Sequence, residues 1–189
     1  MSAPGRQPRA TPSEAWGTVA GGEFARGAAP LGWPGVRRVG PALFRARLGR
    51  GPWPAAHGRG FAESHAGYIR ALGVRGEMLR GLDAVFDGAD VWVHPVAGVT
   101  AFTHRRTGAD LVVDGRSVGY SEPIGDLNAL SALAGTPAVA IPVGTDAAGL
   151  PIGVQMHARR GADAFLLDVA LAVEAAGLSC VPAPPAPFG

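Results

Sequence analysis

A serine, a histidine and two aspartates stand in an order that some hydrolases use. Residues 115–119, Gly-Arg-Ser-Val-Gly, fit the G-x-S-x-G pattern, in which a nucleophilic serine lies on a sharp turn. Asp126 or Asp146 follows, and His157 comes last, which is the order of the triad in hydrolases with this motif. In that chemistry Ser117 Oγ attacks a carbonyl carbon, and His157, oriented by the aspartate, accepts its proton. One hypothesis is therefore an independent serine hydrolase.

The residues around this motif favour a different structure. A nucleophile elbow joins a strand directly to a helix, but Tyr-Ser-Glu-Pro at 120–123 separates the motif from the next helical stretch. Asp114-Gly115 is a typical turn pair, and the apolar residues 111–113 and Val118 on either side of it predict a small β-hairpin. A five-residue pattern with two glycines also arises easily in a chain with 29 of them. We therefore favour the hairpin and expect no catalytic residue in this chain.

The groups that could hold a metal ion or a cofactor are scattered along the chain. The chain has five histidines: His57, His65, His94, His104 and His157. No two of them have the spacing of a helical metal-binding motif such as HExxH. Of these, His94 ends a short apolar run, which is typical of a structural histidine beside a loop or pocket. Cys180 is the only cysteine, so a disulfide within the chain and a cysteine-ligated zinc or iron–sulfur site are excluded. We predict no metal and no cofactor.

All 17 basic side chains are arginines, and the chain contains no lysine. Schiff-base chemistry, a phosphate-binding P-loop and any hydrolase mechanism that needs a serine–lysine pair are therefore excluded for this chain by itself. The formal net charge is +2, and nine of the arginines lie in residues 1–60. They are spread among prolines and glycines without the aromatic residues that interleave the basic groups of single-strand binders. We predict no nucleic-acid partner.

The hydropathy pattern gives no sign of a membrane segment. No apolar run approaches the ~18 residues that a membrane-spanning helix needs. The first 20 residues also lack the apolar stretch of a secretory signal. We expect no membrane contact and a cytoplasmic protein.

Composition divides the chain into three segments. Residues 1–58 are rich in Gly, Pro and Arg and lack periodicity, so we expect them to be irregular or disordered, with only a short helix over 41–48. Residues 59–178 carry regular hydrophobic patterns, and residues 179–189 form a proline-rich, polyproline-like tail. We therefore predict one folded unit between unlike ends.

Within the folded unit, helical and strand patterns alternate. Helical periodicity over 61–86, 124–134 and 162–176 predicts helices, and Gly135 and Gly177 are well placed to end the last two. Short apolar runs predict strands, and besides the hairpin they are residues 91–94, 138–141 and 152–156. This alternation predicts an α/β fold.

Two consecutive blocks resemble the C-terminal portion of the amidase signature family. Residues 128–144 match its helix ending in a-G-x-P-a and its strand ending in P-x-G, and residues 149–155, Gly-Leu-Pro-Ile-Gly-Val-Gln, match its G-L-P-x-G-x-Q. Shorter matches stand in the same order around them, at residues 90–96, 102–104, 113–115 and 163–174. The resemblance covers about residues 61–177 and implies the C-terminal part of a mixed sheet with flanking helices, preceded here by the irregular segment.

The resemblance also implies a chemistry that this chain lacks. The family hydrolyses carboxylic amides with a nucleophilic serine, a second serine and a lysine, and neither a lysine nor a Gly-Gly-Ser-Ser-Gly type segment occurs here. We therefore expect a partial amidase that is inactive alone. By the same resemblance this portion forms part of the acyl side of the substrate site, with Asp126 and Asn128 as the candidate substrate-binding residues.

A small-molecule amide would bind only if the missing part of the fold were supplied. The face that normally packs against that part would be exposed, so the alternative is a non-enzymatic interaction module that binds a protein partner or itself.

Overall fold

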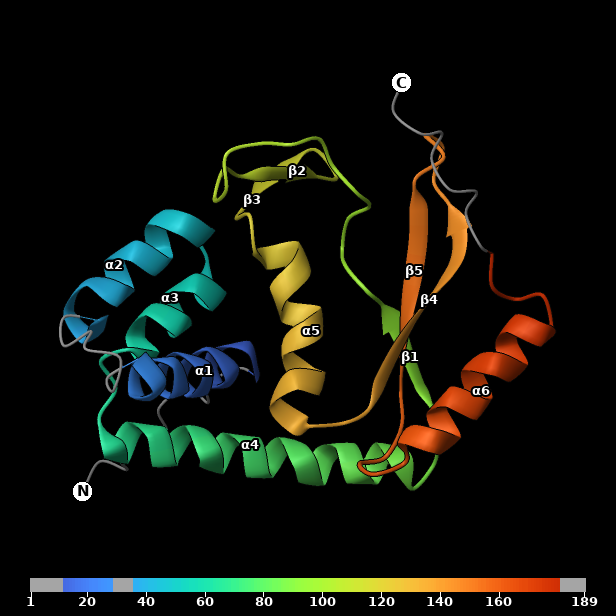
Figure 1. Ribbon diagram of the computed structural model, residues 1–189, viewed down its shortest axis with the longest axis horizontal. Helices are drawn as coiled ribbons and strands as arrows, with labels where there is room; N and C mark the ends of the chain where they lie inside the picture. Colours follow the sequence, from blue (N-terminus) through green and yellow to red (C-terminus); the bar gives the residue numbers. More distant parts are fainter. Residues whose placement is uncertain (1–11, 29–35, 181–189) are drawn as a thin grey trace, which may run out of the picture.

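The computed structural model describes residues 12–28 and 36–180, which form helices around a small sheet (Figure 1). The helices are α1 (Pro12–Ala28), α2 (Val36–Leu48), α3 (Pro52–Gly60), α4 (His65–Phe86), α5 (Glu122–Ala134) and α6 (Asp163–Ala175). The strands are β1 (Trp92–Pro95), β2 (Leu111–Val113), β3 (Arg116–Val118), β4 (Ala138–Thr145) and β5 (Pro151–His157). The predicted α/β class is confirmed. The predicted tail from residue 181 onward lies outside the described residues.

The expectation of an irregular N-terminal segment is wrong for residues 12–28 and 52–58, which form α1 and most of α3, whereas the short helix expected over 41–48 is part of α2. The predicted boundary at residue 59 also falls inside α3. Two glycines of these helices have a packing role. A Cβ on Gly17 would lie 2.7 Å from the Ala56 side chain, and one on Gly60 would lie 2.6 Å from the Thr18 carbonyl oxygen. Glycine at these positions lets α1 and α3 pack backbone against backbone.

The long helix α4 connects the N-terminal helices to the sheet (Figure 1). Ser64 caps its start by accepting a 3.1 Å hydrogen bond from the Gly67 amide. At its other end, Leu82 and Phe86 are buried together with Ala134 at the end of α5. The helix predicted over residues 61–86 is thus confirmed, beginning four residues later than expected.

The predicted hairpin is also confirmed. Strands β2 and β3 pair antiparallel, with Leu111 opposite Val118. Asp114 and Gly115 both have positive φ, 50° and 75°, which is the backbone of a two-residue turn that fits the twist of its strands. A second glycine prediction holds at the end of α5, where Gly135 has φ 69° and its amide donates to the Ser131 carbonyl.

The main sheet has the strand order β1–β5–β4, and both described pairings are antiparallel. Helix α6 covers one face, where Met156, Ala158 and Leu166 form a buried cluster with flanking apolar residues from the strands and the helix. The last turn of the chain that the structure describes returns to β4, because the Cys180 amide donates to the Pro142 carbonyl oxygen at 2.9 Å. Helix α5 stands between the sheet and the N-terminal helices (Figure 1).

Candidate functional site

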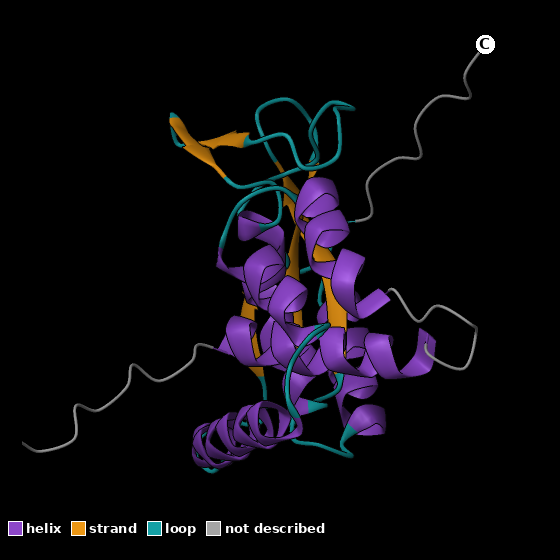
Figure 2. Ribbon diagram, turned by 90° about the vertical axis from the view of Figure 1, so that its left-hand side faces the viewer, coloured by secondary structure: helices purple, strands orange, loops and turns teal. Residues whose placement is uncertain are grey.

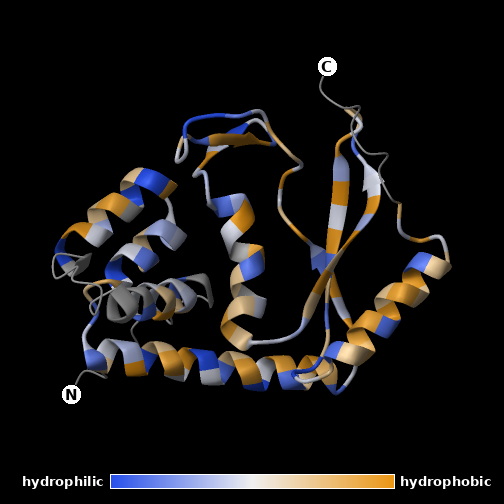
Figure 3. Cartoon of the chain, in the orientation of Figure 1, coloured by the Kyte–Doolittle hydropathy of each residue, from blue (hydrophilic) through white to orange (hydrophobic). Residues whose placement is uncertain are grey.

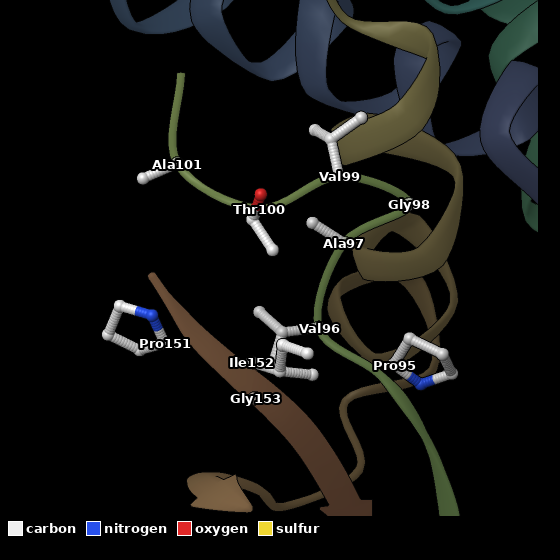
Figure 4. Close-up of a pocket in the computed structure, with 10 residues that line it drawn as sticks. All are labelled: Pro95, Val96, Ala97, Gly98, Val99, Thr100, Ala101, Pro151, Ile152 and Gly153. Carbon is white, nitrogen blue, oxygen red and sulfur yellow. The ribbon is translucent and has the colours of Figure 1, made fainter. Parts of the chain in front are cut away.

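An apolar pocket of about 350 Å³ lies between the loop after β1 and the start of β5 (Figure 4). The pocket is lined by Pro95, Val96, Ala97, Gly98, Val99, Thr100, Ala101, Pro151, Ile152 and Gly153. The hydroxyl of Thr100 is the one side-chain heteroatom among these residues apart from the proline ring nitrogens. The pocket can therefore hold an apolar group, but its lining offers no acid, base or activated nucleophile.

Three hydrogen bonds fix the loop that forms one wall of the pocket. The Val96 amide donates to the Gly153 carbonyl at 3.2 Å, which extends the pairing of β1 with β5. The Val96 carbonyl accepts from Asn128 Nδ2 at 3.4 Å, and the Gly98 amide donates to the Pro123 carbonyl at 2.7 Å. The loop is thus held between β5 on one side and α5 on the other.

The loop approaches the sheet closely at Gly153. A Cβ on Gly153 would lie 3.2 Å from Val96 Cγ2 and 3.6 Å from the Ile141 carbonyl oxygen. Gly153 lies within the G-L-P-x-G-x-Q match of residues 149–155. The small residue keeps both the strand pairing and the pocket wall in place.

Asp146 has a structural role at the turn between β4 and β5. Its carboxylate accepts hydrogen bonds from the amides of Leu150, at 2.9 Å, and Ala148, at 2.8 Å. The Leu150 amide is the main cause that holds the pKa of Asp146 below its ordinary value, and the Thr100 hydroxyl adds to it. The hydrogen bonds of the Asp146 carboxylate thus hold the turn and the pocket wall together. They are not made to His157, the general base of the serine-hydrolase hypothesis.

The two candidate substrate-binding residues both lie in α5, beside the pocket loop. Asp126 is in the second turn of the helix, and its side chain lies outside what the structure describes. Asn128 is half-buried and donates from Nδ2 to the Ile124 carbonyl at 2.9 Å as well as to Val96. Asn128 therefore anchors the loop to the helix. Contact of either residue with a substrate stays a prediction.

The structure does not bring Ser117 and His157 together. Ser117 lies in β3, where its hydroxyl donates to Asp110 Oδ2 at 3.0 Å and accepts from Arg50 at 3.3 Å. His157 ends β5, and its hydrogen-bond partners come from strands of the main sheet and from Thr136. Two views show the hairpin at one end of the molecule, away from this end of β5 (Figures 1 and 2). The serine-hydrolase hypothesis is therefore wrong, because its nucleophile and its general base lie apart.

His157 instead forms a pair with His94, which the sequence interpretation missed. The two Nε2 atoms lie 2.8 Å apart, and the ring planes differ by 14°. The histidines are 63 residues apart in the chain, and only the antiparallel register of β1 and β5 brings them together. The sequence did contain a signal for this pair. Trp92 stands two residues before His94, and Gln155 stands two residues before His157, so in each strand both side chains lie on the same face of the sheet.

The hydrogen bonds of the pair define its protonation. His94 Nδ1 lies 2.8 Å from the Pro95 carbonyl oxygen, so it carries a proton and donates. In neutral His94 the other nitrogen, Nε2, must then accept, which makes His157 Nε2 the donor of the shared hydrogen bond. Burial, and secondly the charge of His94, lowers the pKa of His157 to about 4. His157 is therefore neutral at pH 7.

Within residues 12–28 and 36–180, no group of three or more His, Cys, Asp or Glu residues is placed to hold a metal ion. Cys180 is a free thiol at the end of that range. No helix there has both the length and the apolar character to cross a bilayer.

The comparison with known proteins decides the family. The profile of the amidase family matches residues 44–167, which is well over half of the chain. The chain belongs to the amidase signature family. A fatty acid amide hydrolase from Medicago truncatula is 33% identical over 114 residues, covering 58% of this chain and 18% of that protein. A glutamyl-tRNA(Gln) amidotransferase subunit from Synechococcus sp. strain WH7803 is 40% identical over 104 residues, covering 54% of this chain and 20% of that protein.

Solved structures show the same fold over a larger share of this amidase-family chain. A crystal structure of an amidase aligns with a TM-score of 0.64 at 22% identity, covering 87% of this chain and 35% of that one. The peptide amidase of Stenotrophomonas maltophilia gives a TM-score of 0.54 at 21% identity, covering 90% and 35%. Residues 61–189 amount to only about two thirds of the chain, so these alignments include much of the N-terminal helices. Those helices are part of the shared fold.

This amidase-family chain spans about a fifth of the length of the curated relatives it matches, and about a third of the solved structures. The predicted resemblance to the family, limited to one portion of it, is confirmed.

Proposed function

We propose that this chain forms the apolar wall of an amidase substrate site and does not hydrolyse amides by itself. Its pocket receives the acyl part of an amide when a second polypeptide supplies the catalytic serines and lysine. The observation that carries the proposal is the absence of lysine from a chain that otherwise belongs to the family. A serine can attack an amide only if a base takes its proton, and family resemblance gives that role to lysine.

The lining of the pocket supports a separation in which this chain binds the acyl part of the substrate and a second polypeptide carries out the catalysis. Its lining is almost wholly apolar, and about 350 Å³ is at the lower end of the range for small-molecule sites. Burying methylene groups there contributes about 0.8 kcal/mol each. The same lining has no group that could polarise or attack a carbonyl. It can select a substrate by the shape of its acyl part but cannot transform it.

The outer face of α6 supports the need for a second polypeptide. Leu167 and Leu171 on this helix are 56% and 62% exposed, and Leu178 beyond its end is 66% exposed. Figure 3 shows apolar residues along most of α6, and those that pack toward the sheet include Leu166, Val169 and Val173. A helix that is apolar all round is normally covered on both sides. The partner we propose is the rest of an amidase fold, because this chain aligns with only 35% of the solved structures.

Complementation tests this proposal. A family amidase is expressed without the region that corresponds to residues 44–167, and the full 189-residue chain is supplied as a separate polypeptide. We expect hydrolysis of an aryl amide only when both are present. As a positive control, the deleted region of the same amidase is supplied in trans. If that control restores turnover and this chain does not, the proposal is wrong.

A pocket variant then tests the role of the wall. Ile152 lines the pocket and is 41% exposed, so Ile152→Trp should fill part of the cavity. We expect the complemented enzyme to lose about tenfold or more of kcat/KM for long acyl amides while short ones are spared. Val112→Trp, on the exposed face of the hairpin, is the matched control. Equal losses for long and short substrates would contradict an acyl wall at this position.

Complex formation without turnover would favour the alternative, in which the chain is a non-enzymatic interaction module. The exposed leucines of α6 are the observation that supports this alternative. Stable association of the two polypeptides, with intact catalytic residues and no hydrolysis, is the result that distinguishes it.

A further inference from the structure

The two histidines of the sheet share one face with an amide side chain. In the register of β1 and β5, Trp92 is opposite His157 and His94 is opposite Gln155. Side chains at opposite and alternate positions of paired strands point to the same side of the sheet. His94, His157 and Gln155 therefore converge on the face that α6 does not cover.

On this face His157 Nε2 lies in contact with two other potential ligand atoms. The Nε2 atoms of His94 and His157 are 2.8 Å apart, and Gln155 Oε1 is 3.2 Å from His157 Nε2. A metal ion binds imidazole nitrogen at about 2.0–2.1 Å, so two ligands in adjacent positions of a square-planar ion lie roughly 2.9 Å apart. The separation of the nitrogens already matches this value. Each ring needs only to turn so that both lone pairs point to a common centre.

The other nitrogen of each ring has a partner that suits a metal ligand. His94 Nδ1 donates to the Pro95 carbonyl oxygen at 2.8 Å, and His157 Nδ1 is 3.5 Å from Thr136 Oγ1. Histidines that bind metals usually donate their second ring N–H to such an oxygen, which fixes the tautomer and the ring orientation. The Thr136 hydroxyl can accept as well as donate. His157 can therefore move its proton to Nδ1 and free Nε2 for a metal, with no net release of a proton.

We propose that His94, His157 and Gln155 form a binding site for a divalent transition-metal ion, with Cu²⁺ bound most tightly. Two imidazoles and an amide oxygen in a planar arrangement are a ligand set that suits Cu²⁺, and the Irving–Williams order places Cu²⁺ above Ni²⁺ and Zn²⁺. The site is separate from the apolar pocket and does not depend on the proposed amidase function.

Solvent can reach this site and complete the coordination. Ala138 and Ala140 of β4 stand opposite His157 and Gln155 in the register, and both are exposed. His94 is half-buried, whereas His157 is 1% exposed. The ion therefore enters from the side of His94, with water in the remaining positions.

The test titrates the full chain with Cu²⁺ at pH 7 in a weakly coordinating buffer. The Trp92 ring lies 4.9 Å from the His94 ring and 5.7 Å from the His157 ring, so bound Cu²⁺ should quench its fluorescence. We expect one equivalent to bind, with electron paramagnetic resonance showing two equatorial nitrogens. Trp92→Phe should remove most of the quenching and leave the affinity nearly unchanged.

Variants separate this site from adventitious binding. His94→Ala and His157→Ala should each weaken Cu²⁺ binding by about tenfold or more, whereas His104→Ala, in an exposed loop, should not. Because His157 is buried, His157→Gln provides a second variant if the alanine variant does not fold. The proposal is overturned if the affinity of the parent chain is unchanged by His94→Ala. It is equally overturned if the resonance spectrum shows fewer than two nitrogens.

Discussion

Arg75 on α4 donates a 2.6 Å hydrogen bond from Nε to the carbonyl oxygen of Leu133, in the last turn of α5. Its Nη2 also lies 3.5 Å from the Ala134 carbonyl oxygen. These carbonyls are among the last four of the helix, which have no partner within it. A cation at the end of a helix also interacts favourably with the helix dipole. Arg75 thus ties α4 to the helix that holds the pocket loop.

Arg75→Met should remove this tie and lower the free energy of unfolding by about 1–3 kcal/mol, since a hydrogen bond from a charged donor is lost and a carbonyl loses its partner. Urea denaturation measures the change. Arg70→Met, at an exposed position of the same helix, is the matched control and should change stability by less than about 0.5 kcal/mol. Equal effects of the two substitutions would show that the bond to Leu133 contributes nothing.

Gly153→Ala should destabilise the fold by about 1–3 kcal/mol, because the new methyl group would lie 3.2 Å from Val96 Cγ2. The pocket wall would move with Val96. Gly144→Ala is the control in the same strand pair, where nothing lies within 4 Å of an added Cβ. Thermal unfolding of both variants checks the prediction, and an unchanged Tm for Gly153→Ala would contradict the close approach.

Truncation of two leucines of α6 should change the stability of the chain by very different amounts. Leu166 is 2% exposed and belongs to the buried cluster under the helix, so Leu166→Ala should lower stability by about 2–5 kcal/mol. Leu171 is 62% exposed, and Leu171→Ala should change the stability of the isolated chain by less than about 0.5 kcal/mol. The midpoints of chemical denaturation decide this. If Leu171→Ala is as destabilising as Leu166→Ala, the outer face of α6 is already covered in the isolated chain.

Stability should fall on acidification because of His157. Its pKa is lowered from 6.5 to about 4 in the folded chain, so the unfolded chain binds more protons between these values. Stability therefore rises with pH across this window, is fully present above about pH 6.5 and is lost as the pH falls toward 4. We expect the free energy of unfolding at pH 5 to be lower than at pH 7, by on the order of 1 kcal/mol after solvent screening.

His157→Gln should flatten this dependence, and urea midpoints at pH 5, 6 and 7 measure it. His104→Gln, in the exposed loop, should keep the slope of the parent chain. A slope that persists in His157→Gln would assign the acid sensitivity to other groups.

The sequence predicted the elements whose signals are local. Gly135 could be placed at the end of a helix because a left-handed residue is needed there, and Asp114-Gly115 could be placed in a hairpin because both residues must have positive φ.

The missed features depend on contacts that are distant in sequence. Helices α1 and α3 were not predicted because their segment is rich in Gly and Pro and lacks periodicity, whereas in the fold Gly17 and Gly60 allow the two helices to touch. The pair of His94 and His157 depends on the register of two strands more than 60 residues apart. The pocket joins residues 95–101 to residues 151–153, two segments that are distant in the sequence and meet only in the fold. Tertiary packing defines all three.

The most direct test of the central claim is the activity of the full chain alone. The purified protein is incubated with a fluorophosphonate probe and with aryl amides of short and long acyl chains, and labelling is mapped by mass spectrometry. Because the chain has no lysine and Ser117 lies in a hairpin away from His157, we predict no labelled serine and no turnover above the blank. Labelling of a single serine together with hydrolysis that its alanine variant abolishes would contradict the account.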